Sequence, residues 1–217
     1  MKYYYFILFL FLSCVESSNI DLPIIGPSDF KEELVNNKVN KEQSHFVSDF
    51  ELINQNGDTI TYKDYENKIY VVDFFFTRCG SICPIMTNNM KKIQDKFLEN
   101  DNLMLLSISV TPNIDNVETL KKYAKSKGVI NSKWNIATGN KKHIYELARK
   151  SYFAVLKKGD GGLQDFIHTP NFILIDKKKQ IRGIYNGTDD IEIKRVINDI
   201  KTLQIKKALL QKMAINT

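Results

Sequence analysis

The chain has 217 residues, 43% of them hydrophobic, which is enough for the core of one domain with a short appendage. Its formal net charge of +6 comes from lysines scattered along the chain, without a basic face that is interleaved with aromatic side chains. The composition therefore argues against a nucleic-acid-binding protein and indicates a mildly cationic globular one.

The N-terminus resembles a bacterial export signal. Lys2 supplies the positive start, and Tyr3–Leu12 is apolar but too short to span a membrane, which needs about 20 apolar residues. The motif Leu12-Ser13-Cys14 is similar to the lipobox of bacterial lipoproteins, in which the cysteine becomes the lipid-bearing N-terminus. We therefore predict lipid attachment at Cys14, with ordinary cleavage or an uncleaved anchor as the alternative.

This signal divides the chain into three parts. We predict a signal peptide at residues 1–13, a lipid-anchored tether at 14–45 and a folded domain at 46–217. Within the tether, Leu22–Pro27 is expected to be extended, as a linker or an edge strand. Such an anchor would hold the domain at the membrane of a bacterial cell envelope, on its periplasmic side.

The predicted domain begins with a hairpin and a buried strand. Residues 50–60 predict a β-hairpin that turns at Asn56-Gly57. The run Tyr70–Phe76 is β-branched and aromatic, which is typical of a strand buried on both faces. Pro84 is well placed at the first position of a helix that runs to about Asn100. The strand therefore leads directly into the N-terminus of a helix.

The remaining elements alternate between strands and helices before a second hairpin. We expect strands at Leu103–Val110 and Trp134–Ala137, helices at Asn116–Lys127 and Lys141–Phe153, a mobile glycine-rich loop at Leu156–Asp165, a hairpin formed by Phe166–Asp176 and Gln180–Tyr185, and a helix from Asp189 to about Met213. This is the order of elements in thioredoxin. The predicted fold class is therefore α/β, a thioredoxin-like fold with a central mixed β-sheet flanked by helices and an N-terminal β-hairpin.

Two cysteines lie at the junction between the buried strand and the next helix. If Cys14 carries lipid, Cys79 and Cys83 are the pair that is left in the mature protein. A disulfide across so short a loop would restrict little of the unfolded chain, which favours a redox or metal-binding role over a structural one. The helix N-terminus and the neighbouring Arg78 both favour a thiolate at this place.

The spacing of the pair allows more than one chemistry. A thioredoxin reductant usually separates its cysteines by two residues, whereas three separate Cys79 from Cys83. The wider spacing permits a disulfide, and it also permits two thiolates to bind one ion. Soft thiolates select Cu(I), Zn(II) or iron–sulfur clusters. Clusters and structural zinc normally require four protein ligands, whereas Cu(I) can be satisfied by three.

A third ligand to such an ion would be an imidazole, and the sequence offers three histidines. His143 falls in the first turn of a predicted helix and is expected to be exposed, and His45 is expected to be a surface residue before the domain. His168 lies between the glycine-rich loop and a predicted strand, at a junction that faces the cysteine loop in a thioredoxin-like fold. We expect His168 to be the ligand, with a half-buried histidine that caps the hairpin as the alternative.

Several motifs resemble those of the SCO/SenC family. Phe76–Pro84 is similar to that family's signature Phe-Thr-x-Cys-x-x-x-Cys-Pro, and His168–Asp176 matches its histidine and the strand that follows. Ser107–Pro112 and Leu120–Ala124 resemble two further family blocks. The resemblance extends roughly over residues 46–203, and the cysteine motif with a distant histidine is specific.

The resemblance implies a membrane-anchored, thioredoxin-like protein that binds one copper, as Cu(I) or Cu(II), through Cys79, Cys83 and His168. The implied partner is the copper-bearing subunit of cytochrome c oxidase, or another copper or thiol client, and nucleic acid is not among the implied partners. We therefore predict a copper metallochaperone that assists assembly of the oxidase copper centre, rather than an enzyme. The alternatives are a thiol–disulfide oxidoreductase, in which Cys79 and Cys83 form a redox pair that reduces a partner, and a peroxidase-like thiol enzyme, for which no dedicated pocket is indicated.

Two positions bear on this resemblance. Family members usually carry Asp before the Pro at the end of the second strand, where this chain has Thr111. Pro170, two residues after His168, is a candidate for the position of the cis-proline of thioredoxin.

Overall fold

The computed structural model describes residues 22–29, 45–156, 159 and 165–215 of the chain. The predicted signal peptide, the lipid-attachment residue Cys14 and most of the predicted tether lie outside these residues, as does most of the glycine-rich loop. Among the described residues, no helix is both long enough and apolar enough to cross a membrane.

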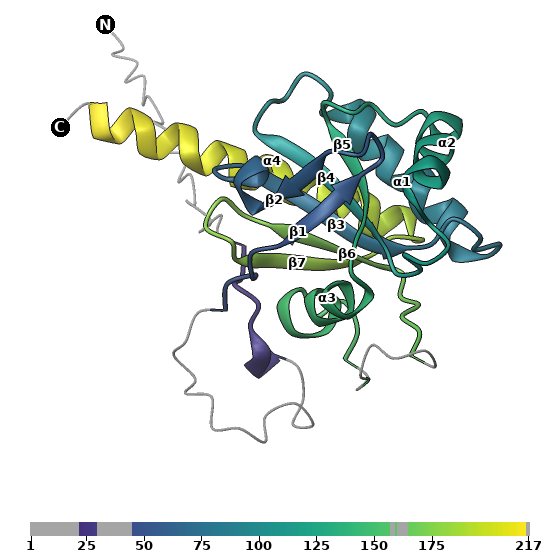
Figure 1. Ribbon diagram of the computed structural model, residues 1–217. Helices are drawn as coiled ribbons and strands as arrows, with labels where there is room; N and C mark the ends of the chain where they lie inside the picture. The colour runs from purple at the N-terminus through teal and green to yellow at the C-terminus, as the bar shows by residue number, and fades with distance from the viewer. Residues whose placement is uncertain (1–21, 30–44, 157–158, 160–164, 216–217) are drawn as a thin grey trace, which may run out of the picture.

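Seven strands form one mixed sheet in the order β2-β1-β5-β4-β3-β6-β7 (Figure 1). Strands β3 and β5 run parallel to β4, and the pairings on both sides of this parallel core are antiparallel. The strands are β1 (Glu51–Asn54), β2 (Thr59–Thr61), β3 (Ile69–Phe75), β4 (Leu103–Ser109), β5 (Trp134–Thr138), β6 (Asn171–Ile175) and β7 (Ile181–Asn186). The sheet confirms the predicted thioredoxin-like α/β fold, with the β1–β2 hairpin added at one edge.

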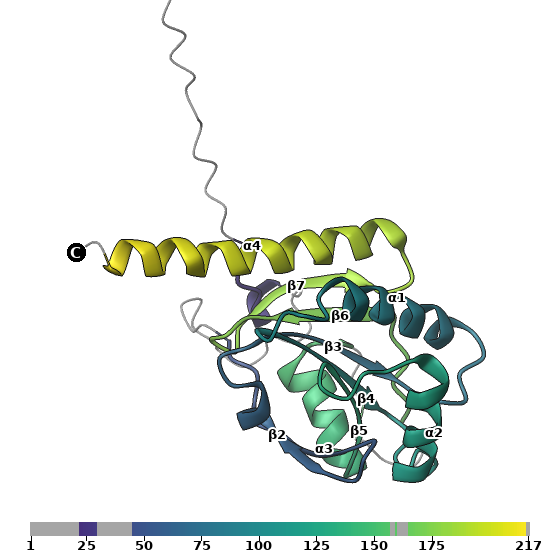
Figure 2. The same ribbon diagram turned by 90° about the horizontal axis from the view of Figure 1, so that it is seen from above.

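The helices cover both faces of this sheet. The helices are α1 (Ile82–Lys96), α2 (Val117–Lys127), α3 (Lys141–Glu146) and α4 (Asp190–Ile215), with a π-helical turn (Leu147–Ser151) after α3 and the short 3₁₀ helices η1 (Pro27–Asp29) and η3 (Tyr62–Tyr65). Buried residues of α1, α2 and α4 pack on one face, whereas those of α3 pack on the other. Figure 2 shows α1 and α4 together on one side of the sheet and α3 on the opposite side.

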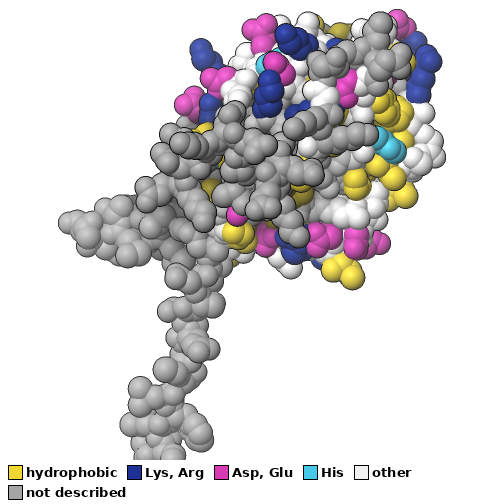
Figure 3. Space-filling model, turned by 90° about the horizontal axis from the view of Figure 1, so that it is seen from below, with side chains coloured by type: hydrophobic (Ala, Val, Ile, Leu, Met, Phe, Trp, Pro, Cys, Tyr) yellow, Lys and Arg dark blue, Asp and Glu magenta, His cyan; other side chains and the backbone are white. Residues whose placement is uncertain are grey.

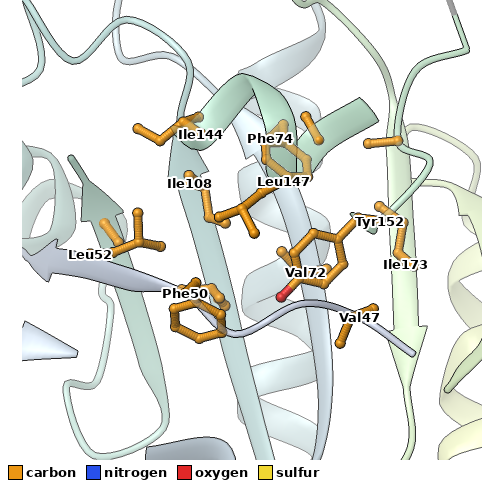
Figure 4. Packing of buried hydrophobic residues seen from close by; sticks show 14 of the residues in the cluster. Val47, Phe50, Leu52, Val72, Phe74, Ile108, Ile144, Leu147, Tyr152 and Ile173 are labelled. Carbon is orange, nitrogen blue, oxygen red and sulfur yellow. The ribbon is translucent and has the colours of Figure 1, made fainter. Parts of the chain in front are cut away.

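Burial on both faces of strand β3 explains why its sequence, except at Asp73, is apolar without alternation. Val72 and Phe74 belong to the cluster under α3, which Figure 4 shows from close by. Val71 and Phe75 point the other way, into the cluster under α1 and α4. Because every residue of β3 is buried, polar side chains would be costly on either face, and the apolar run correctly predicted a central strand.

Most predicted elements are confirmed, with corrections at two helices. Helix α1 begins at Ile82, two residues before Pro84, so Pro84 lies within the first turn instead of opening it. Proline is tolerated there because the first backbone N–H groups of a helix have no intrahelical acceptor. The predicted helix from Lys141 to Phe153 remains α-helical only to Glu146 and then continues as the π-helical turn.

Part of the predicted tether packs against the edge of the sheet at β7. The Ile25 N–H donates to the Ile181 carbonyl at 2.9 Å, which forms an isolated antiparallel bridge. Next to it, the buried Arg182 guanidinium donates to the carbonyls of Leu22 and Pro23 and forms an ion pair with Asp176 at 2.8 Å. Of the two expected forms for this stretch, the structure therefore shows pairing at the edge of the sheet.

Candidate metal centre

The loop between β3 and α1 brings the two cysteines together. The Cys79 N–H donates to the Phe76 carbonyl at 3.3 Å, which turns the chain sharply after the strand. Because α1 begins at Ile82, Cys83 lies in its first turn, and its backbone N–H donates to the Cys79 Sγ at 3.4 Å. Both cysteines are buried and both are free thiols.

His168 reaches the same place from β6. Strand β6 is antiparallel to β3 and pairs Phe172 with Asp73, so the chain just before β6 passes the loop that follows β3. The imidazole is exposed, and its Nε2 lies 3.8 Å from the Cys79 Sγ. The ligand atoms of Cys79, Cys83 and His168 all lie within 4.8 Å of one another. Among the described residues, no other group of three metal-ligating side chains is as close.

Aromatic rings flank the imidazole. Phe76, next to the cysteine loop, lies 5.1 Å from the Phe166 ring and 5.8 Å from the His168 ring between centroids, and Phe166 lies 6.3 Å from His168. Phe166 is half exposed. In the space-filling view, hydrophobic side chains gather beside an exposed histidine at one edge of the molecule (Figure 3). Packing against rings therefore holds His168 near the thiols.

The two thiols have opposite electrostatic environments. Burial raises the pKa of Cys79, but hydrogen bonds from the Cys83 thiol, the Cys83 N–H and Ser81 outweigh it and lower that pKa to about 6. Burial and the neighbouring Cys79 raise the pKa of Cys83 to about 12. Cys79 is therefore a thiolate near neutral pH while Cys83 keeps its proton, because a shared proton favours one anion over two.

The donor set suits a soft, low-coordinate ion. One sulfur is readily ionised, the second lies one helical turn away, and a histidine Nε2 approaches from the opposing strand. Two thiolates and an imidazole fit Cu(I), whereas a structural zinc site would need a fourth ligand. The same dithiol could alternatively cycle between reduced and disulfide forms.

The other two histidines lie elsewhere, and neither is simply exposed as predicted. His143 is half-buried, and its Nε2 is buried without a hydrogen-bond partner among the described residues. His45 is half-buried as well; its Nε2 lies 2.6 Å from the Ser151 carbonyl and its ring lies 4.4 Å from that of Phe153. The structure thus separates His45 and His143 from the thiols and brings only His168 to them.

The proline next to the site does not have the predicted geometry. All described peptide bonds are trans, including the bond before Pro170, so the hypothesis of a cis-proline at this position is wrong. Thr169 instead fixes the approach to β6, because its hydroxyl donates to the Ala154 carbonyl at 3.0 Å.

The sequence interpretation missed one buried group at this site. Asp115, in the loop after β4, is fully buried and accepts hydrogen bonds from Thr77, which precedes Cys79 by two residues. The only signal in the sequence was its place four residues after Thr111, in a segment that the family resemblance already covered.

A thioredoxin-like domain with a Cys-x-x-x-Cys pair at a helix N-terminus and a facing histidine defines a class of dithiol proteins that can hold a metal ion. The SCO1/SenC family model matches residues 38–204, and the chain belongs to this family.

Three solved structures show how closely the fold agrees. A SCO1/SenC family lipoprotein from Bacillus anthracis is 30% identical, with a TM-score of 0.65 over 76% of this chain and 99% of that one. BsSco, described as a member of the Sco family of cytochrome c oxidase assembly proteins with a disulfide switch, is 31% identical, with a TM-score of 0.63 over 77% and 98%. Copper-bound ScoI from Arabidopsis thaliana is 27% identical, with a TM-score of 0.57 over 72% and 98%.

Proposed function

We propose that this protein is a copper metallochaperone that carries one copper ion to a client during assembly of the copper centre of cytochrome c oxidase. The observation that carries the proposal is the placement of Cys79, Cys83 and His168, whose ligand atoms lie within 4.8 Å of one another. The copper-bound plant relative and the oxidase-assembly role ascribed to the Sco family support it.

Each proposed ligand has a distinct part in binding the ion. Cys79 meets the ion first, because it is already a thiolate near neutral pH while Cys83 is still protonated. Cys83 loses its proton as its sulfur joins, since only the thiolate binds metal. His168 completes three-fold coordination from the exposed side, where an incoming client sulfur can replace it.

A copper titration of the reduced, full-length protein tests this proposal. Competition with a Cu(I) chelator of known affinity should give one copper per protein, and Cys79→Ser or Cys83→Ser should abolish that binding. If both serine variants bound Cu(I) as tightly as the wild type, the copper site would lie elsewhere and the proposal would be wrong. A suitable control is His143→Ala, because the His143 side chain lies apart from the two thiols.

A second function, thiol–disulfide exchange with a client, is favoured by the unequal pKa values of the two thiols. A low-pKa thiol beside a protonated one is the arrangement of a nucleophile and its resolving partner. BsSco is described as containing a disulfide switch, which suits this alternative. The two functions make different demands on His168, because copper binding needs its imidazole as a ligand and disulfide exchange needs only the two thiols.

We further propose that Cys14 carries a lipid and holds the domain at the periplasmic side of a bacterial membrane. The support is the motif Leu12-Ser13-Cys14 in the sequence and the description of the Bacillus anthracis relative as a lipoprotein. Labelled fatty acid should appear on the wild-type protein and not on Cys14→Ala, which should move into the soluble fraction. Wild-type protein without label would rule out the lipid anchor.

A further inference from the structure

Asp115 is a buried carboxylate on which two loops converge. Its Oδ2 accepts hydrogen bonds from the Ser109 hydroxyl at 2.6 Å, the Thr111 hydroxyl at 2.9 Å and the Thr77 N–H at 3.1 Å. Its Oδ1 accepts the Thr77 hydroxyl at 2.5 Å. Ser109 and Thr111 lie at the end of β4 and in the loop after it, whereas Thr77 lies in the cysteine loop.

Neutral donors alone satisfy this carboxylate. Within the described part of the chain, no Lys, Arg or His forms an ion pair with Asp115, which has no exposed surface. A buried carboxylate without a counter-ion is costly unless hydrogen bonds solvate it, and several donors with one geometry can do so. The loops are therefore fixed relative to each other, because any displacement of Thr77 would leave part of the carboxylate unsolvated.

Thr77 transmits this constraint to the thiols. Thr77 stands two residues before Cys79, and the Cys79 N–H donates to the carbonyl of Phe76, the residue just before Thr77. The Cys79 Sγ in turn accepts the Cys83 N–H. From Asp115 to the two sulfurs, the path runs through Thr77 and one tight turn.

We propose that Asp115 is the positioning residue of the cysteine loop, acting through Thr77 to set the separation of Cys79, Cys83 and His168. This inference rests on the proposed copper-binding function for its main readout. It also gives Thr111 a role, since the Thr111 hydroxyl donates to Asp115 where an ionised Asp could not. The residue that departs from the usual family pattern is thus part of the anchor in this chain.

The test compares variants that remove or keep single donors. Thr77→Val keeps the shape and loses the hydroxyl donor, Thr77→Ser keeps the donor, and Asp115→Asn replaces the acceptor. The control is Asp176→Asn, because Asp176 is another buried carboxylate; it accepts the backbone N–H groups of Lys178 and Gln180 between β6 and β7 and pairs with Arg182. For each full-length variant, we would measure Cu(I) affinity by chelator competition, the dithiol–disulfide midpoint potential and the unfolding midpoint.

Thr77→Val and Asp115→Asn should weaken Cu(I) binding about 10- to 100-fold, the range for groups that orient metal ligands, and should shift the midpoint potential. Thr77→Ser should keep the Cu(I) affinity and the midpoint potential of the wild type. Asp176→Asn should lower only the unfolding midpoint. Wild-type affinity and potential in Thr77→Val and Asp115→Asn would overturn the inference and leave Asp115 a purely structural group. If Asp115→Asn does not fold, Thr77→Val against Thr77→Ser decides.

Failure of the proposed function gives a different pattern. If the wild-type protein bound no Cu(I), the metallochaperone function would be wrong. The midpoint potentials alone would then test the positioning role of Asp115. Unchanged potentials in that case would overturn the positioning role as well.

Discussion

The Sγ of Cys79 and the Nε2 of His168 lie 3.8 Å apart, although 89 residues separate them in the chain. Strand pairing brings them together, since β6 runs antiparallel to β3 and both flanking loops emerge at the same end of the sheet. Cys79 is bonded within its loop, whereas His168 is exposed and packs mainly against Phe76 and Phe166. The thiols thus form the fixed side of the site and the imidazole the accessible side.

The first prediction concerns the reactivity of the two thiols. Because hydrogen bonds lower the pKa of Cys79 to about 6, its alkylation by iodoacetamide should rise with pH around a midpoint near 6. Cys83, with a pKa raised to about 12, should be modified much more slowly at every pH below that value. Cys83→Ala removes one of those hydrogen bonds and should move the Cys79 midpoint upward. Mass spectrometry of the modified protein over a pH series measures this, and a wild-type midpoint above 8 would contradict it.

The second prediction concerns oxidation of the pair. Both sulfurs must be thiolates to bind the ion, so a Cys79–Cys83 disulfide and copper should exclude one another. The oxidised protein should take up no Cu(I) until it is reduced, and uptake by the reduced protein near neutral pH should release protons, chiefly from Cys83. Chelator competition in a weakly buffered solution with a pH indicator follows both events. Equal affinity of the oxidised and reduced forms would show that the thiols are not the ligands.

The strands and the three candidate ligands could be predicted because local patterns specify them. The run of β3, apolar except at Asp73, and the Asn56-Gly57 turn depend on neighbouring residues alone, and the cysteine spacing with a histidine before a strand is a motif. Asp115 could not be found in this way, since a buried carboxylate and a surface one look alike in sequence. Its role depends on Thr77, which is 38 residues away and reaches it only through the parallel pairing of β3 with β4.

The third prediction concerns Asp73, a buried acid in the middle of β3. Burial raises its pKa to about 7, although a hydrogen bond from Ser107 partly opposes this shift. A carboxyl with a higher pKa in the folded than in the unfolded chain binds protons more tightly when folded. Its contribution to the free energy of unfolding is therefore fully present below about pH 4, falls as the pH rises to about 7, and is constant above.

Asp73→Asn removes that titration and keeps an acceptor for Ser107. The variant should be more stable than wild type at pH 8, and its stability should lack a slope of up to about 1.4 kcal/mol per pH unit between pH 4 and 7. Urea unfolding of both proteins over this range measures the difference, in which the titrations of exposed carboxylates cancel. Parallel stability curves for the two proteins would show that Asp73 has an ordinary pKa.

The last prediction separates the metallochaperone from the oxidoreductase. Disulfide exchange needs the two thiols, and the pKa of Cys79 is lowered by Cys83 and Ser81 rather than by His168. A three-coordinate copper site, in contrast, loses one of its three ligands without the imidazole. His168→Ala should therefore weaken Cu(I) binding by at least about tenfold and leave dithiol–disulfide cycling largely intact, whereas Cys79→Ser and Cys83→Ser should abolish both. His143→Ala is the matched control, because His143 lies apart from the thiols and its replacement should alter neither property.

In cells, the metallochaperone function further predicts that His168→Ala lowers cytochrome c oxidase activity and that added copper partly restores it. If oxidase activity were normal with His168→Ala and lost with the Cys79 and Cys83 variants, the protein would instead be a thiol reductase that uses the same pair without carrying copper.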